Sequence, residues 1–250
     1  MKIRILGCGG SFGSPIAWDK NGNIDVNNKK NLRLRSSILI ENSETTVLVD
    51  TSPDLRQQLY QAKCTNVDAV LFTHNHYDHT SGLPDMRAIS LINNKIIPAY
   101  IPKQYESEIL THYKYIFKGD KNYQPFMNLN ILQDKFKIDN MQFETFKHNH
   151  GDIDVQTFRI NNFAYSTDLK KFYNNDIDKL KNLDLWIVGM LRYDPHPSHC
   201  GFNDVLKYID YLKPKKTIFT HMTPLIDEKE ILKKCPPNVF PGYDGLELIV

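Results

Sequence analysis

The sequence predicts an α/β fold in which two β-layers pack together and helices lie outside them. Three observations support this prediction. Short apolar runs typical of strands recur in both halves of the chain, helical patterns lie between these runs, and 250 residues fit one large domain or two small ones. Because no internal repeat divides the chain, we expect residues 1–250 to form a single domain.

The first half of the chain opens with a strand and a glycine-rich turn. Four glycines between positions 7 and 13 follow the first apolar run. They favour a tight connection over a dinucleotide-binding loop, because Pro15 and a polar segment stand where such a loop would open a helix. Pro53 starts a helical pattern, since proline is tolerated in the first helical turn. In chain order we expect strands at 2–6, 37–41 and 45–49, a polar mobile loop at 17–35, a helix at 53–64, a strand at 68–73, a helix at 84–93 and a strand at 96–101.

The second half begins with residues 103–137, which are rich in tyrosine and phenylalanine. This segment predicts helices and a loop that either cover a site or pack on the core. Farther along, Val205, Leu206, Ile209 and Leu212 recur at helical spacing and define an apolar helix face. We expect strands at 141–147, 154–160, 163–167, 184–190, 216–220 and 246–250, and helices at 203–212 and 227–234.

The charges are nearly balanced, with 31 basic and 29 acidic side chains and a net charge of +2. A dedicated nucleic-acid binder usually shows a clear basic excess, so this balance argues against that class. Lys29, Lys30, Arg33 and Arg35 form a local basic cluster near the N-terminus. We expect this cluster to belong to a solvated loop.

The cellular compartment is predicted from the cysteines and from the first residues. The chain carries four cysteines without a C-x-x-C spacing, and it opens on a strand-like run rather than a signal peptide. Its apolar stretches are far shorter than a membrane span. We therefore expect a cytoplasmic protein with reduced thiols and no membrane association. The oligomeric state stays open, and a homodimer is compatible with these features.

The segment from Thr73 to His79 packs four metal-competent side chains directly after an apolar run. His74 and His76 are two residues apart, so both imidazoles point to one side of an extended segment. Asp78 and His79 follow at once and can serve a second ion beside the first. Burying several polar side chains at the end of a strand costs free energy unless they have a partner, so this cluster predicts a binding site.

Two ions need more donors than this segment offers, because each ion takes several protein ligands and keeps an open position. The same form recurs later in the chain, where an apolar strand ends at His150, at Asp168 and at His221. His148 lies one strand step from His150 and competes with it for the same role. Asp50 also ends an apolar strand, and we expect it to accept a hydrogen bond from a ligand histidine and so fix its tautomer.

The pattern His-x-His-x-Asp-His, followed by Gly82-Leu83, resembles the signature of the metallo-β-lactamase superfamily. The resemblance implies an α/β fold of the four-layer αβ/βα sandwich type, with a dinuclear metal site at the edge between the two sheets. The family places a His-Gly pair where His150-Gly151 stands, which favours His150 over His148. Imidazole and carboxylate donors suit zinc best, with manganese or iron as alternatives. The resemblance implies one ion on His74, His76 and His150, a second on Asp78, His79 and His221, and Asp168 with a water molecule bridging them.

The expected chemistry is hydrolysis of an ester, amide, thioester or phosphoester. A divalent cation lowers the pKa of bound water from about 15.7 toward about 7 and so supplies a nucleophile at neutral pH. The loop at 191–199 follows an apolar strand and adds an arginine and two histidines. Arg192 and His196 are candidates for binding an anionic substrate. His199 is a candidate for protonating the leaving oxygen or stabilising the developing charge.

Further segments narrow the resemblance to PhnP-like metal-dependent phosphodiesterases, whose namesake opens a cyclic ribose phosphate. The resemblance implies catalytic roles for His199, Asp78 and Asp168, and a small cyclic or nucleotide-like phosphodiester as substrate. The chain departs from the namesake because no cysteine follows Gly13 until Cys64. It therefore supports no cysteine-rich structural zinc site, and the exact substrate stays open. The segments that carry the resemblance are residues 5–11, 50–56, 85–88, 195–199 and 220–222.

Two other functions stay open. One is a transfer-RNA 3′-processing endonuclease of the same superfamily acting on an RNA end, although such enzymes usually carry a long basic arm and residues 103–137 are short for one. The other is a non-catalytic, metal-stabilised binding module, which the intact ligand set argues against. The absence of a secretion signal disfavours a β-lactamase, and the short segment 222–250 disfavours a glyoxalase II.

Overall fold

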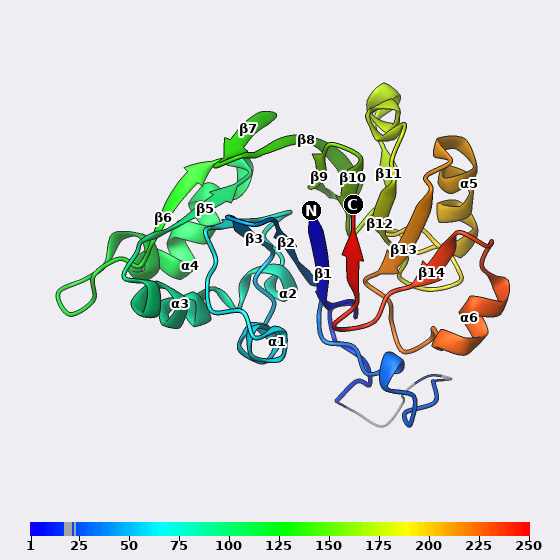
Figure 1. Ribbon diagram of the computed structural model, residues 1–250, viewed down its shortest axis with the longest axis horizontal. Helices are drawn as coiled ribbons and strands as arrows, with labels where there is room; N and C mark the ends of the chain where they lie inside the picture. The colour runs from blue at the N-terminus through cyan, green and yellow to red at the C-terminus, as the bar shows by residue number, and fades with distance from the viewer. Residues whose placement is uncertain (18–21, 23) are drawn as a thin grey trace.

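The computed structural model of the chain contains two β-sheets packed face to face, with helices on their outer faces (Figure 1). It describes residues 1–17, 22 and 24–250. This arrangement confirms the predicted four-layer αβ/βα sandwich. In the described residues, no helix is both long enough and apolar enough to span a bilayer.

The first sheet is built from the N-terminal half of the chain and the last strand. Its strands follow the order β15-β1-β2-β3-β4-β5-β6. The pairs from β15 to β3 are antiparallel, and those from β3 to β6 are parallel. The bounds are β1 Lys2–Gly7, β2 Ser37–Glu41, β3 Thr46–Val49, β4 Ala69–Leu71, β5 Ile97–Ile101, β6 Met127–Ile131 and β15 Glu247–Ile249.

The second sheet is built from the C-terminal half and follows the order β11-β8-β9-β10-β12-β13-β14, with β7 also paired to β8. The strands β10, β12, β13 and β14 are parallel, whereas β9 is antiparallel to both β8 and β10. The bounds are β7 Lys135–Ile138, β8 Met141–His150, β9 Ile153–Ile160, β10 Phe163–Ser166, β11 Lys171–Phe172, β12 Leu185–Gly189, β13 Lys216–Thr220 and β14 Val239–Pro241.

Helices cover the outer face of each sheet (Figure 1). In β2, Ile38 and Ile40 join the core shared with the second sheet, while Leu39 between them packs in the cluster beneath α1, α3 and α4. This alternation follows from the two-residue period of a strand, and it explains why the predicted strands are apolar on both faces. The helices are α1 Leu55–Ala62, α2 Tyr77–Thr80, α3 Met86–Asn93, α4 Glu106–Lys118, α5 Phe202–Leu212 and α6 Glu228–Lys234, and the 3₁₀ turns are η1 Lys29–Asn31, η2 Leu83–Asp85, η3 Lys103–Tyr105 and η4 Asn174–Leu180.

Strand direction brings distant parts of the chain to one edge. β3 and β4 are parallel, so their carboxyl ends lie at the same edge of the first sheet. β8 runs in the same direction as β10 and β13, because β9 is antiparallel to both of its neighbours. A backbone hydrogen bond of 3.0 Å from Gln156 N to Thr73 O joins the two sheets near these ends. The residues that follow the strands therefore meet between the sheets.

The expectation of a solvated basic loop at 17–35 holds for Lys29 and Lys30, which are exposed, and is wrong for Arg33; residues 18–21 and 23 lie outside the described part of the chain. Arg33 is only 2% exposed, and its guanidinium donates to the carbonyls of Thr223 and Ile226. Arg35 pairs with Asp54 at 2.7 Å. Arg33 therefore ties the loop to carbonyls of the C-terminal half, and Arg35 ties it to the residue before α1.

The aromatic segment 103–137 contains strands as well as helices, where the sequence predicted helices and a loop. It forms η3, α4, β6 and the start of β7. Most of α4 packs on the first sheet, where Ile109, Ile116 and Phe117 are buried. At its start, Glu108 accepts a hydrogen bond of 2.5 Å from Asn75. The segment therefore packs mainly on the core, and only its first turn borders the predicted site.

Asp244 gives a pH-dependent stability prediction. Its carboxylate accepts from Leu34 N at 2.6 Å and from Cys8 N at 3.2 Å, and burial raises its pKa from 3.8 to about 7. The folded chain therefore holds a proton that the unfolded chain has released, so stability falls as the pH rises from about 4 to about 7. Because the residue keeps some contact with solvent, we expect a loss of about 2 kcal/mol rather than the full ~4 kcal/mol.

The Asp244→Asn variant lacks this ionisation, so the stability difference between wild type and variant should change across that pH window. Urea unfolding of both proteins at pH 5 and pH 7, with metal removed by a chelator, measures it. The titration of all other groups cancels in the difference. Parallel pH dependences for the two proteins would contradict the raised pKa.

Candidate metal centre

Histidine and aspartate side chains from both sheets converge at the edge between them. His74 and His76 follow β4, and α2 carries Asp78 and His79. His150 ends β8, Asp168 follows β10 and His221 follows β13. Their donor atoms form triads in which all atoms lie within 4.8 Å of one another: His74, His76 and His150; Asp78, His79 and His221; His74, His79 and Asp168; and His150, Asp168 and His199.

The backbone turns sharply where three of the strands end. Asp50, Asp168 and His221 have φ values of 62°, 52° and 57°, in the left-handed region. A residue with a side chain pays about 1–2 kcal/mol for this conformation, and such strain concentrates at functional sites. The left-handed turn therefore ends each strand and places the side chain at the edge of the sheet.

The centre buries three carboxylates, those of Asp50, Asp78 and Asp168, each at most 3% exposed. Among the described residues, their ion-pair partners are histidines, and no lysine or arginine lies within salt-bridge distance of them. Burial alone would raise the pKa of Asp168, but His221 and His79 outweigh burial and hold the pKa well below its usual range. The positive charge that these anions require must come from imidazolium groups or from bound cations.

The histidines differ in their preferred charge. Burial opposes a charge on His79, but Asp78 and Asp50 outweigh burial and raise its pKa well above the usual value. Burial and the nearby His79 lower the pKa of His74 well below the usual value. A neutral imidazole beside a carboxylate-rich group is the state that binds a divalent metal.

Unpaired nitrogen atoms show that the residues fit divalent cations. His74 Nε2 and His79 Nε2 are buried without a hydrogen-bond partner. A buried nitrogen left without a partner costs about 1–3 kcal/mol, so each of these atoms indicates a missing partner. The mixed imidazole and carboxylate donors suit zinc, and the same set accommodates manganese.

The structure brings His150 to the centre and keeps His148 away from it. His148 uses both ring nitrogens elsewhere, on Thr157 Oγ1 at 2.9 Å and on the carbonyl of Thr167 at 2.8 Å. Burial lowers its pKa to about 4, so this ring is neutral at physiological pH. His150 instead donates through Nδ1 to the carbonyl of Ser198 at 2.8 Å, which leaves Nε2 toward the centre, 3.7 Å from Asp168 Oδ1.

Asp50 occupies the position expected of a residue that orients a ligand. It is fully buried, and its Oδ2 lies 2.7 Å from His79 Nδ1. Imidazoles that bind a metal usually donate their second N–H to a carboxylate in this way. This bond directs His79 Nε2 toward Asp78 and Asp168, at 3.4 Å and 3.3 Å.

The loop at 191–199 places one of its predicted residues at the centre. His199 is 9% exposed, stacks on the ring of His221 with centroids 5.3 Å apart, and lies 4.0 Å from Asp168 through Nδ1. The guanidinium of Arg192 donates to the carbonyls of Asp194 and Pro195, so it braces the loop.

His196 lies farther out on the same loop, with its ring 5.4 Å from that of His199 and hydrogen-bonded to Ser198. Lys170, which belongs to no motif in the sequence, donates to the carbonyls of His196 and His199 at 2.5 Å and 3.5 Å. In the sequence, only its position two residues after Asp168 indicates a role at the metal centre. Lys170 thus anchors the loop that presents His199.

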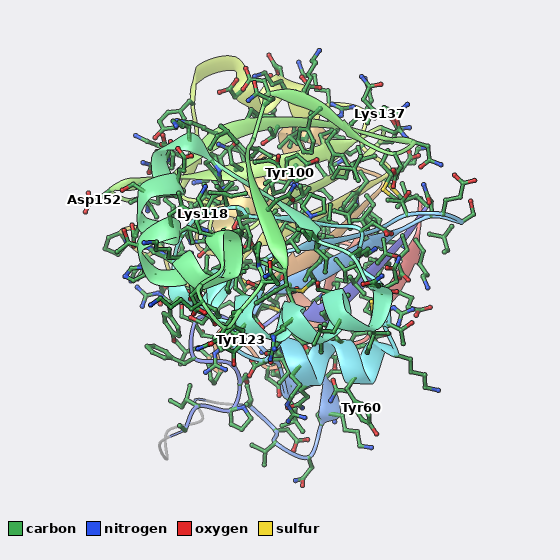
Figure 2. All side chains as sticks on the ribbon, turned by 90° about the vertical axis from the view of Figure 1, so that its left-hand side faces the viewer. Tyr60, Tyr100, Lys118, Tyr123, Lys137 and Asp152 are labelled. Atoms are coloured by element: carbon green, nitrogen blue, oxygen red, sulfur yellow. The ribbon has the colours of Figure 1, made fainter. Side chains whose placement is uncertain are left out.

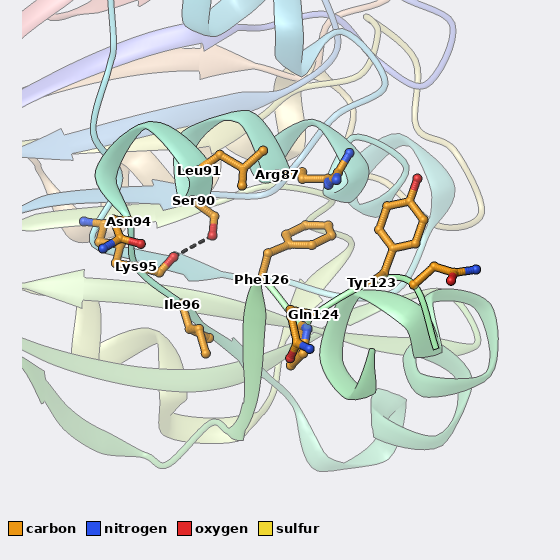
Figure 3. Close-up of a pocket in the computed structure, with 11 residues that line it drawn as sticks. Arg87, Ser90, Leu91, Asn94, Lys95, Ile96, Tyr123, Gln124 and Phe126 are labelled. Carbon is orange, nitrogen blue, oxygen red and sulfur yellow. Dashed lines mark hydrogen bonds between the residues drawn. The ribbon is translucent and has the colours of Figure 1, made fainter. Parts of the chain in front are cut away.

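A cavity of about 770 Å³ opens beside His76 and His150. Lys171 lines it and is exposed, and it makes no ion pair in the described part of the chain. Asp152 lies at the rim and projects from the molecular edge (Figure 2). A separate cavity of about 450 Å³ lies between α3 and the segment before β6, where Arg87 covers the ring of Tyr123 (Figure 3). None of the residues that line this second cavity belongs to the metal centre.

Comparisons with known proteins agree with this geometry. A family model described as a β-lactamase superfamily domain matches residues 45–222. An octanoyltransferase of Porphyromonas gingivalis is 30% identical over 260 residues, a match that covers 100% of this chain and 52% of the relative. The chain therefore spans about half the length of this curated relative.

Solved structures share the whole fold. A protein described as a new diphosphatase from the PhnP family has a TM-score of 0.90 and 27% identity, and the match covers 100% of this chain and 97% of that one. Zinc-bound PqqB from Methylobacterium extorquens has a TM-score of 0.80 at 15% identity, with 100% of both chains covered. The short form of human tRNase Z has a TM-score of 0.74 at 15% identity, with 100% of this chain and 99% of that one covered. At 15% identity, the last two likenesses concern the fold alone.

Proposed function

Since this chain is a PhnP-like member of the metallo-β-lactamase superfamily, we propose that it is a hydrolase that cleaves a small phosphodiester or diphosphate with the help of two divalent metal ions. The observation that carries the proposal is the pair of donor triads. His74, His76 and His150 form one, Asp78, His79 and His221 form the other, and Asp168 lies against both.

The donor set supports two ions held next to each other, with zinc or manganese as candidates. When bound, two such ions would acidify a water molecule and stabilise the negative charge of a phosphoryl group. The protein side chains supply the rest. Asp168 contacts donors of both triads, and Asp50 holds His79 in place from behind. His199 lies beside both Asp168 and His221, where its ring can donate a hydrogen bond to a substrate oxygen.

The adjacent cavity supports a small anionic substrate. Lys170 and Lys171 place two positive charges in its lining, against one carboxylate at Asp152. Its volume of about 770 Å³ has room for a nucleotide-sized group beside the scissile phosphate. A diphosphatase activity is named for the PhnP-family protein of the same fold, and phosphoanhydrides therefore belong in the substrate panel.

The transfer-RNA endonuclease alternative finds less support. Residues 103–137 are used by η3, α4, β6 and the start of β7, which pack in the fold and do not extend as a basic arm. The likeness to human tRNase Z concerns the fold, at 15% identity. RNA ends remain a substrate class for the same test.

The proposed function predicts that protein loaded with zinc or manganese hydrolyses bis(p-nitrophenyl) phosphate. We expect removal of the metal with a chelator to abolish turnover, and re-addition of metal to restore it, because the buried carboxylates and histidines alone provide no nucleophile. Release of p-nitrophenol at 405 nm measures the rate. If the fully metallated, folded protein leaves phosphodiesters and diphosphates intact but cleaves acyl thioesters or lactones, the phosphodiesterase assignment is wrong.

A further inference from the structure

We propose that the hydroxyl of Thr73 is a positioning group that, together with Asp50, fixes the ring tautomer of one ligand in each metal triad. A single buried carboxylate would then support both ion positions. The inference rests on the two-ion centre of the proposed function, and it is independent of which bond the enzyme cleaves.

The contacts form one continuous chain of hydrogen bonds. Asp50 Oδ1 accepts from Thr73 N at 2.9 Å, and Thr73 Oγ1 lies 2.8 Å from Asp50 Oδ2. On its other side, Thr73 Oγ1 lies 2.9 Å from His74 Nδ1. Asp50 Oδ2 also lies 2.7 Å from His79 Nδ1. All four residues are 0% exposed, so these hydrogen bonds are formed away from bulk solvent.

The direction of each bond follows from the available protons. An ionised carboxylate only accepts, so the single hydroxyl proton of Thr73 points to Asp50. The Thr73 oxygen must then accept from His74, which places the ring proton on Nδ1 and leaves Nε2 with a free lone pair. His79 likewise donates from Nδ1 to Asp50 and leaves Nε2 free. These two Nε2 atoms are among the buried nitrogens without a hydrogen-bond partner.

Loss of the hydroxyl should act on one ion position only. Valine has nearly the shape of threonine, but it leaves His74 Nδ1 without an acceptor in a buried site. His74 then loses the preference for the tautomer that exposes Nε2. Asp50 keeps the backbone N–H of residue 73 and the Nδ1–H of His79 as donors, so the position that contains His79 should keep its affinity. Serine retains the hydroxyl and provides the matched control.

The test titrates metal-free protein with zinc against a chromogenic chelator. We expect wild type and Thr73→Ser to bind two ions, and Thr73→Val to bind one ion with unchanged affinity and the other about 10–100-fold more weakly. The melting temperature of the metal-free proteins should differ little, which separates positioning from folding. If Thr73→Val does not fold, Thr73→Ala removes the same hydroxyl with a smaller side chain.

Double variants assign the weakened position. In a His221→Ala background the remaining ion depends on His74, and Thr73→Val should weaken it 10–100-fold. In a His76→Ala background the remaining ion depends on His79, and the same change should have no effect. Equal effects in both backgrounds, or no effect in either, would overturn the inference. Wild type that binds two ions without cleaving phosphate esters would refute the proposed function and leave this inference intact.

Discussion

Replacing Asp168 by alanine should lower the turnover of bis(p-nitrophenyl) phosphate by about 10³-fold or more, which corresponds to at least ~4 kcal/mol of activation free energy. The reason is its position between the two triads. Asp168 Oδ1 lies 3.2 Å from His221 Nε2 and 3.7 Å from His150 Nε2, and Oδ2 lies 3.3 Å from His79 Nε2. Among the described residues, the other carboxylate of the two triads, Asp78, pairs only with His79 and His221 of its own triad.

The comparison needs a control for surface charge and for folding. Asp210→Ala removes an exposed aspartate on α5 and should leave the rate unchanged. Elemental analysis of each protein shows whether the loss of activity follows the loss of metal. An Asp168→Ala enzyme that retains a tenth or more of the wild-type rate would show that the reaction does not depend on the shared carboxylate.

Replacing His199 by alanine should reduce kcat by about 10²–10³-fold while both ions stay bound and KM changes little. Burial lowers the pKa of His199 to about 3, so its ring is neutral near pH 7. A neutral imidazole still carries one N–H group, and it can donate that hydrogen to charge developing on a phosphoryl or leaving oxygen. We therefore expect His199 to act as a hydrogen-bond donor in the transition state.

Glutamine at the same position separates the two roles considered for this residue. If His199 acts as a hydrogen-bond donor, His199→Gln keeps an N–H group of similar reach, and its kcat should be about tenfold higher than that of His199→Ala. If His199 instead transfers a proton to the leaving group, the two variants should be equally inactive. Steady-state kinetics with p-nitrophenyl substrates measures both variants. An alanine variant within fivefold of wild type would remove His199 from the chemistry.

The ligand strands were predictable because the sequence places each donor at the end of an apolar run. The spacing of His74 and His76, and the recurrence of a polar residue after buried strands, already indicate a common edge. The choice between His148 and His150 lies beyond that pattern, because residues two apart in a strand face the same side. It is decided by Thr157 on the neighbouring strand and by the carbonyl of Ser198, which are tertiary contacts.

The parts of the fold that escaped prediction depend on contacts between distant residues. β11 has two residues and β14 has three, too few to show a strand period, and each forms by pairing with a longer neighbour. The basic cluster near the N-terminus looked solvated because its composition is polar. Arg33 is buried because carbonyls of the C-terminal half accept its protons, and no local pattern reports such a partner.

The meeting of the first and last strands has a consequence for how larger proteins can be assembled from this unit. β15 lies antiparallel to β1, and the amino group of Met1 donates to the carbonyl of Val250 at 2.9 Å (Figure 1). β1 runs from Met1 toward the Gly10 turn, which lies beside His221, so both chain ends emerge at the edge opposite the metal centre. A polypeptide fused to either end would therefore start at one shared edge of the domain and leave the cavity beside His76 and His150 uncovered.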